Sequence, residues 1–169
     1  MKRERTERNL KGAILGLILT VGFLNLFGCA AKDDVSFARK VMAGLVAGRY
    51  SVRGSIDWAS LKVMDKDVSA EYNKLPNDQE KTDYQRSFID NFKKGFRSQH
   101  ATFKSFNQWR LFSDKDPNIK VVAAGCPDKT KVFLFSIRHA HSAMRLIAIG
   151  VLQITDEAVF KAFEKGRAL

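Results

Sequence analysis

Two histidines, His139 and His141, stand two positions apart in the stretch RHAHS. On a strand, this spacing puts both imidazoles on one face, where they could bind the same metal ion. A zinc site generally needs at least three protein ligands, and the remaining candidates, His100 and Cys126, lack the spacing of a known motif. The alternative is a polar hairpin turn with solvated histidines. We therefore expect no metal and no cofactor, and we keep His139 and His141 as the residues to examine for one.

Cys126, in AAGCPDKT, is a second residue that could do chemistry, as a nucleophile. A cysteine nucleophile needs a nearby base and an activated thiolate. His139 or His141 could supply the base only if the fold brings one of them beside the thiol. No family signature surrounds Cys126, which favours a turn cysteine without a catalytic role.

A group of four carboxylates could offer a general acid and a general base: Asp57, Asp65, Asp67 and Glu71. An enzyme built around a cavity would place one such group in an apolar pocket and shift its pKa. Nothing in the sequence singles one of them out, and we interpret the group as a solvated polar face. The sequence also contains no phosphate-binding glycine loop, Ser-His-Asp motif or cofactor fingerprint. We therefore predict no catalytic residue.

Cys29 lies at the end of an apolar segment that follows a charged leader. Residues 1–11 are basic, residues 13–26 are apolar, and small residues flank Cys29. This order is typical of a secretory signal. The uncharged run that ends at Ala31 is also 20 positions long, which is enough for a spanning helix. An uncleaved anchor and plain secretion are therefore the alternatives. In each case the positive-inside bias exports the chain after Ala31.

The sequence LFGC, Leu26 to Cys29, resembles the lipobox of bacterial lipoproteins, with Leu three positions before the cysteine and a small residue, Gly28, just before it. The resemblance implies a diacylglyceryl group on the Cys29 thiol, cleavage between Gly28 and Cys29, and an acylated amine. Phe27 departs from the pattern, because a smaller residue is usual there. Ala30 is similar to the pattern that sends Gram-negative lipoproteins to the outer membrane. Two or three acyl chains on one cysteine anchor a protein stably, since each methylene buried in the membrane contributes about 0.8 kcal/mol.

The composition describes a globular domain with an appendage. The 169 residues are 45% hydrophobic and 28% charged, with a formal net charge of +11. After residue 28 there remain 24 basic and 16 acidic side chains, a net charge of +8. A basic surface implies anionic partners. Because the signal exports this part of the chain, we expect anionic envelope polymers or another envelope protein rather than nucleic acid.

Apolar periodicity predicts two amphipathic helices. The first runs from Val35 to Val46 and ends at Gly48, a glycine just past the periodic run. Asn77 and Asp78 predict the start of a long second helix. Aromatic residues recur every four positions inside it: Tyr84, Phe88, Phe92 and Phe96. We interpret this stripe as a core face packed against the sheet rather than a ligand site.

A less regular segment between the two helices could form a short third helix, with Asp57 near its start. Its apolar positions are Ile56, Trp58, Leu61 and Met64. Downstream of His100 four segments predict strands: 101–112, 119–124, 131–138 and 143–154. Short turns between them favour antiparallel pairing. Their nearly continuous apolar runs indicate burial on both faces, with helices covering at least one side. Residues 155–163 predict a final helix.

Helices followed by strands predict an α+β fold in which N-terminal helices pack on a curved antiparallel sheet of about four strands, with a short C-terminal helix. This order resembles the nuclear transport factor 2-like, or cystatin-like, fold. The resemblance implies a sheet that wraps the long helices around a cone-shaped cavity, in a fold that hosts enzymes and binding modules alike. We expect residues 1–28 to be the signal peptide, 29–34 a tether and 35–169 a single domain.

These observations favour a non-catalytic binding or assembly module, anchored in the cell envelope through lipid on Cys29. In a Gram-negative cell it would face the periplasm from the outer membrane. The alternative is a small cavity enzyme of the isomerase or hydrolase type. A desolvated, hydrogen-bonded carboxylate or histidine in a pocket would favour the enzyme. A closed cavity, or one lined only by Phe and Leu, would favour the binding module.

Overall fold

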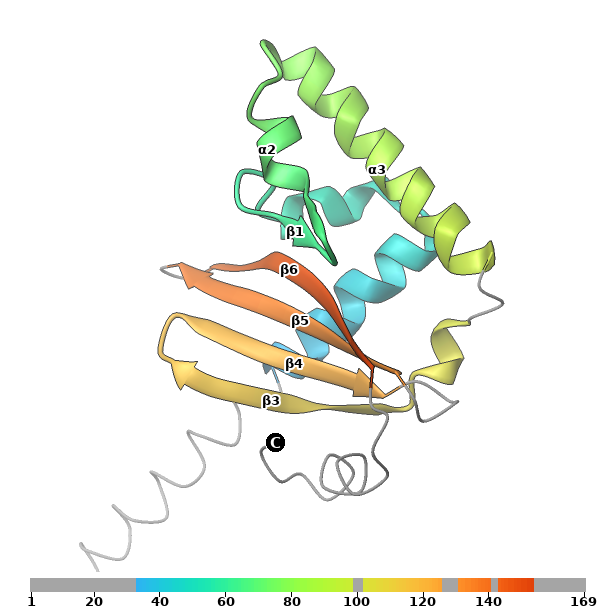
Figure 1. Cartoon of the computed structure of the whole chain (residues 1–169), viewed down its shortest axis with the longest axis vertical. Helices are drawn as coiled ribbons and strands as arrows, with labels where there is room; N and C mark the ends of the chain where they lie inside the picture. The colour runs from blue at the N-terminus through green and yellow to red at the C-terminus, as the bar shows by residue number, and fades with distance from the viewer. Residues whose placement is uncertain (1–32, 99–101, 126–130, 141–142, 154–169) are drawn as a thin grey trace, which may run out of the picture. The chain divides into compact units, whose positions relative to one another are not determined.

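The α+β class predicted from the sequence is confirmed, because helices pack against a six-stranded mixed sheet (Figure 1). The computed structural model describes residues 33–98, 102–125, 131–140 and 143–153. All of these except Asp33 belong to the compact unit that begins at Asp34. The C-terminal helix expected over residues 155–163 lies outside the described residues.

The helical elements are the N-terminal helix (residues 33–47), η1 (Tyr50–Ser55), α2 (Val68–Tyr72), α3 (Asp78–Ser98) and η2 (Phe103–Ser105). The strands are β1 (Lys62–Val63), β2 (Lys66–Asp67), β3 (Gln108–Asp116), β4 (Ile119–Gly125), β5 (Lys131–Ala140) and β6 (Ala143–Gln153). Their order in the sheet is β2-β1-β6-β5-β4-β3. Strands β3 to β6 form an antiparallel meander, and β1 joins β6 in parallel.

The expectation of about four strands was too low, because β1 and β2 extend the sheet beyond β6. Each has only two residues, too few for apolar alternation to show in the sequence. The short helix expected from Ile56 onward is also wrong. Ile56 forms a bridge with Leu146, and the Asp57 N–H donates to the Leu146 carbonyl at 2.9 Å. Backbone groups that would form hydrogen bonds within a helix instead bond to the edge of β6.

Strand β3 departs from its predicted bounds at both ends. It begins at Gln108, well inside the expected strand over 101–112, because the 3-10 turn η2 precedes it. It then continues through much of the expected turn, since Asp116 still pairs with Ile119 of β4. The bend itself takes only the two residues between that pair, a tighter connection than the polar composition indicated.

The N-terminal helix ends at Gly48, as predicted. Gly48 has φ +71°, in the left-handed region that favours glycine. Its N–H donates to the Leu45 carbonyl at 3.0 Å, and the Arg49 N–H donates to the Gly44 carbonyl at 2.9 Å. These two bonds are those of a Schellman motif, which satisfies carbonyls that a helix end leaves unpaired.

Helix α3 begins where the capping residues predict. The Asn77 side-chain oxygen accepts from the Glu80 N–H at 2.9 Å, and the Asn77 side-chain amide donates to the Glu80 carboxylate at 2.9 Å. The first bond satisfies one of the unpaired N–H groups of the first turn. Asp78 and Glu80 add negative charge at the positive end of the helix dipole. Local chemistry therefore fixes the position at which the long helix starts.

One apolar core joins the N-terminal helix, α3 and one face of the sheet. Across the meander, Val122, Phe135 and Ile149 pair in register on three neighbouring strands, and all are buried. Ala123 and Val132 belong to a separate, smaller cluster and are also fully buried. Side chains on both faces of the sheet are therefore buried, which agrees with the nearly continuous apolar runs of these strands.

Candidate functional site

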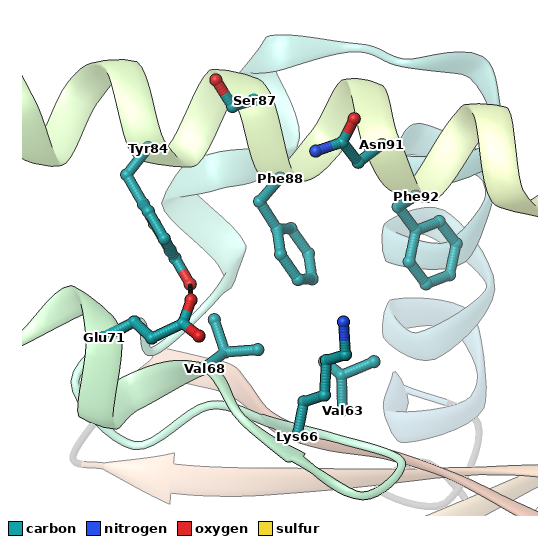
Figure 2. Close-up of a pocket in the computed structure, with 9 residues that line it drawn as sticks. All are labelled: Val63, Lys66, Val68, Glu71, Tyr84, Ser87, Phe88, Asn91 and Phe92. Carbon is teal, nitrogen blue, oxygen red and sulfur yellow. Dashed lines mark hydrogen bonds between the residues drawn. The ribbon is translucent and has the colours of Figure 1, made fainter.

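A pocket of about 270 Å³ lies between α3 and the segment formed by β1, β2 and α2 (Figure 2). We call it the hairpin pocket. Its lining residues are Val63, Lys66, Val68, Glu71, Tyr84, Ser87, Phe88, Asn91 and Phe92. The volume lies just below the range of about 300–1,000 Å³ that is common for small-molecule sites. A small ligand therefore fits this pocket better than a large one.

Aromatic rings from successive turns of α3 form the apolar wall of the pocket. Phe88 and Phe92 have ring centroids 6.3 Å apart, and Phe88 meets Trp58 edge-on at 5.4 Å. Both phenylalanines are half-buried. On the opposite side, the buried Val68 and the half-buried Val63 complete the apolar lining. The site thus offers a ligand two aromatic and two aliphatic surfaces.

The aromatic stripe of α3 was predicted as a core face, which is correct only in part. Phe96 is buried, whereas Tyr84, Phe88 and Phe92 are half-buried and face the hairpin pocket. Ile89, from outside the stripe, is 1% exposed and is the other buried residue of α3. The cause is the hairpin of β1 and β2 with α2, elements absent from the prediction, which faces the first turns of the stripe (Figure 2).

Tyr84 and Glu71 join α3 to α2 at one end of the pocket. The Tyr84 hydroxyl donates to Glu71 Oε2 at 2.9 Å. Partial burial, together with the hydrogen bond to Glu71 and its negative charge, raises the pKa of Tyr84 to about 12. The phenol therefore stays protonated at neutral pH and remains a donor to the carboxylate. A second bridge, from Gln85 to the Tyr72 hydroxyl at 3.1 Å, supports the same contact between helices.

Lys66 is the cation of the hairpin pocket. It lies on β2, and its amine points toward the space between Phe88 and Phe92 (Figure 2). Within the described part of the chain, no carboxylate lies within ion-pairing distance of this amine. Glu71, the acidic residue of the lining, is already bound to Tyr84. The pocket therefore combines apolar walls with one cation that has no protein partner there.

The turn of the hairpin positions Lys66 through an unusual backbone conformation. Met64 has φ +52°, which is uncommon for a residue other than glycine. Its N–H donates to the Ile149 carbonyl at 2.7 Å, which ties the turn to β6. The Met64 side chain is 52% exposed. Strained backbone of this kind gathers at binding sites, which makes the hairpin a functional candidate.

The carboxylates singled out in the sequence have separate positions. Asp57 forms an ion pair with Arg138 at 2.7 Å. Asp67 caps α2, and hydrogen bonds from the Ser69 hydroxyl and the Ala70 N–H lower its pKa. Glu71 reaches the hairpin pocket, and the exposed Asp65 lies in the hairpin turn. The structure does not bring these four carboxylates together as an acid–base pair.

His139 is paired with a carboxylate that the sequence did not indicate. Its Nε2 atom lies 2.6 Å from Oδ1 of Asp34, which is 2% exposed. This pair does not line the hairpin pocket. In the described ranges, no three side chains of the His, Cys, Asp or Glu type are arranged to hold a metal ion. The other predicted site residues lie outside the described residues: Gly28, Cys29, His100, Cys126 and His141.

Lys66 was missed in the sequence because its role depends on the two-residue strands. No signal for this role was present in the sequence, because a lysine between Asp65 and Asp67 is typical of an ordinary solvated surface, and only the structure shows that Lys66 forms no ion pair with either carboxylate. Lys66 pairs with Val63 in the β1–β2 hairpin, and Figure 2 shows its amine directed toward α3.

No protein-family model, curated protein or solved structure matches this chain. None of the helices in the described part of the chain has the length and apolar character needed to cross a membrane. Function is therefore inferred from the chain's own residues, in the hairpin pocket and in the N-terminal motif.

Proposed function

We propose that the protein is an envelope lipoprotein, anchored through lipid on Cys29, whose folded part is a non-catalytic binding module. The hairpin pocket is its ligand site. One observation carries this proposal. The apolar wall of Phe88 and Phe92 faces the amine of Lys66, and this amine has no acidic partner among the described residues.

The lining favours a small, mainly apolar molecule with one anionic group. Apolar surface removed from water contributes about 25 cal/mol per Å², and the rings of Phe88 and Phe92 offer such surface at the pocket wall. The Lys66 amine can donate charge-assisted hydrogen bonds to a carboxylate or sulfonate. Glu71 would repel a second anionic group. An aromatic or short aliphatic acid satisfies all three conditions.

The proposed anchor rests on the LFGC motif and on the short distance from it to the folded unit. Four residue steps separate Cys29 from Asp33, the first described residue of the N-terminal helix. An extended chain covers about 3.5 Å per residue, so this tether spans about 14 Å at most. Lipid on Cys29 would therefore hold the domain close to the surface of the membrane.

The order of the elements supports the proposed likeness to the nuclear transport factor 2-like fold. A first helix and the long helix α3 precede the antiparallel meander of β3 to β6. The hairpin pocket, however, is lined from α3, α2 and the β1–β2 hairpin, and by no residue of the meander. The ligand site proposed here is thus separate from the cone-shaped cavity that this fold implies.

The Asp34–His139 pair favours a second candidate, a small hydrolase. A buried carboxylate that orients an imidazole is two thirds of a nucleophilic triad. Among the described residues, no hydroxyl or thiol is hydrogen-bonded to the His139 ring. Tyr84, with its pKa raised to about 12, is a poor acid and a poor base at neutral pH. The pocket therefore supports binding more directly than catalysis.

The ligand proposal can be tested with the full chain in a neutral detergent. Calorimetry would compare 4-phenylbutyrate with its neutral amide. We expect Phe92→Ala to weaken both ligands, and Lys66→Gln to weaken only the acid. Lys62→Gln is the matched control, because Lys62 is an exposed lysine of the neighbouring strand that does not line the pocket. Absence of saturable binding, or an unchanged affinity in Phe92→Ala, would contradict the proposal.

The anchor is tested separately. The wild-type chain, expressed in a Gram-negative host, should partition into the detergent phase and incorporate a labelled fatty acid. Cys29→Ser should abolish the label. Label that persists in this variant would disprove lipidation at Cys29 without bearing on the pocket.

A further inference from the structure

A second pocket, of about 380 Å³, lies between the N-terminal helix and η1 and shares no lining residue with the hairpin pocket. Its polar lining consists of Lys40, Arg49, Ser51 and Ser55, and the rest is small or apolar. No carboxylate belongs to this lining. We call it the cationic pocket.

The backbone holds the elements of this pocket in close contact. At Gly44 an added Cβ atom would lie 2.9 Å from Cβ of Val52, which is closer than side chains pack. The η1 turn therefore packs directly on the helix, with Val52 buried at the contact. Ser51 and Ser55, on η1, are brought beside the helix by this packing.

Arg49 is positioned by the end of the helix. It directly follows Gly48, and its N–H donates to the Gly44 carbonyl. This bond and the one from Gly48 to Leu45 occupy two carbonyls at the negative end of the helix. Both carbonyls are therefore engaged, which reduces the repulsion that a bound anion would meet there.

The two cations of the pocket have no partner within the described ranges. Neither the Lys40 amine nor the Arg49 guanidinium forms an ion pair or hydrogen bond with a described residue. Other arginines of the domain are engaged: Arg138 binds Asp57, and Arg53 donates to the Tyr50 hydroxyl at 2.7 Å. Two unpaired positive charges at one hollow attract an anion from solution.

The geometry points to a phosphate-binding site: we propose that Lys40 and Arg49, with the hydroxyls of Ser51 and Ser55, bind a phosphate group. The arginine fork matches phosphate oxygens in pairs, the lysine acts as a point charge, and each serine can donate one bond. A phosphomonoester carries a charge of about −1.5 to −2 at pH 7, which two cations balance. The volume also leaves room for a substituent on the phosphate.

The phosphate could belong to a soluble phosphomonoester or to a lipid headgroup, since both present phosphate oxygens to the same four side chains, although a headgroup phosphodiester carries only one negative charge. A domain held near a membrane surface would meet headgroups, whereas a soluble phosphomonoester would reach the site by diffusion. The proposal does not depend on the hairpin pocket having a ligand, because the two pockets share no residue.

The test uses the full chain in a neutral detergent and follows backbone amide shifts by NMR. One arm adds inorganic phosphate and the other adds short-chain phosphatidylglycerol, with chloride keeping the ionic strength constant. We expect saturable shifts at Gly44 and Ser51 with at least one probe. Lys40→Gln and Arg49→Gln should each weaken binding about tenfold, which corresponds to the lower end of the contribution that a hydrogen bond to a charged group makes. The affinity of Arg49→Lys should lie between the affinities of these two variants and that of the wild type.

Lys115→Gln is the matched control, because it removes an exposed lysine that does not line the pocket. Stronger binding of inorganic phosphate supports a soluble ligand, and stronger binding of the lipid supports a headgroup. No saturable shift with either probe, an unchanged affinity in Arg49→Gln, or an equal loss in Lys115→Gln would overturn the proposal. Circular dichroism would check that each variant is folded, as expected for exposed side chains.

Discussion

The imidazole Nε2 of His139 lies 2.6 Å from the carboxylate of Asp34, joining residues that are 105 positions apart in the chain. Asp34 stands near the start of the N-terminal helix, and His139 is on β5. Asp34 is nearly inaccessible to solvent, whereas the His139 side chain is 36% exposed. The contact therefore fixes the beginning of the first helix to the sheet.

We expect loss of this contact to destabilise the domain. Asp34→Ala should lower the free energy of unfolding by about 1–3 kcal/mol, the usual cost of removing a hydrogen bond that includes a charged or buried partner. His139→Ala should have an effect at least as large, because it leaves the nearly inaccessible Asp34 carboxylate without this partner. The measurement is urea denaturation of both variants and of the double variant. If the two single effects simply add, the pair does not contribute as a pair.

The contrast between Ile89 and Phe92 tests the division of α3 into core and pocket. Ile89 is fully enclosed, so Ile89→Ala should cost about 2–5 kcal/mol of unfolding free energy. Phe92→Ala removes a larger side chain that is only half-buried, and we expect it to cost less, about 1–3 kcal/mol. Chemical denaturation measures both values. A larger loss of unfolding free energy in Phe92→Ala than in Ile89→Ala would show that Phe92 belongs to the core.

The β1–β2 hairpin, which forms one side of the hairpin pocket, could not be predicted from local sequence. Helix starts and ends were predictable because their signals are local: Asn77 caps α3, and Gly48 ends the N-terminal helix. The meander was predictable because its strands are long, and all except β3 are largely apolar. The β1–β2 hairpin was not, because two-residue strands carry no periodicity, and they form only through the pairing of β1 with β2 and of β1 with β6.

Met64 explains why the sequence did not predict the turn of the hairpin either. A tight turn with positive φ usually carries Gly, Asn or Asp at that position, whereas this chain has Met64. The Met64 N–H bond to Ile149 and the pairing of the flanking strands hold the unfavourable conformation in place. Places where local preference and structure disagree are common at functional sites, which agrees with a ligand site beside this hairpin.

Two glycines with opposite surroundings give a third prediction. Gly48 has φ +71°, and an added Cβ would lie 2.7 Å from Cδ of Lys93. Gly48→Ala should therefore lower the free energy of unfolding by about 1–2 kcal/mol, the cost of a left-handed conformation. Gly95 has open space around it within α3. Gly95→Ala should raise stability by about 0.5–1 kcal/mol. Thermal denaturation measures the change in the melting temperature of each variant, and changes of the same sign would contradict this prediction.

Tyr84 gives a prediction at alkaline pH. Its pKa is raised to about 12 in the folded protein, above its ordinary value of about 10. The folded state thus holds the phenolic proton more tightly than the unfolded state. The stability that this provides is fully present below about pH 10 and is lost as the pH rises toward 12. The wild-type protein should therefore lose stability over this interval relative to Tyr84→Phe, which has no such proton to lose.

Ultraviolet absorbance of tyrosinate, compared between the wild type and Tyr84→Phe, gives the pKa of this residue directly. Glu71→Gln should move that pKa only part of the way back to its ordinary value. The substitution removes the negative charge and the charged acceptor, but partial burial, the largest cause of the shift, remains. A complete return would mean that Glu71 alone holds the proton on Tyr84. A normal Tyr84 pKa in the wild type would show that in solution Tyr84 is neither partly buried nor hydrogen-bonded to Glu71.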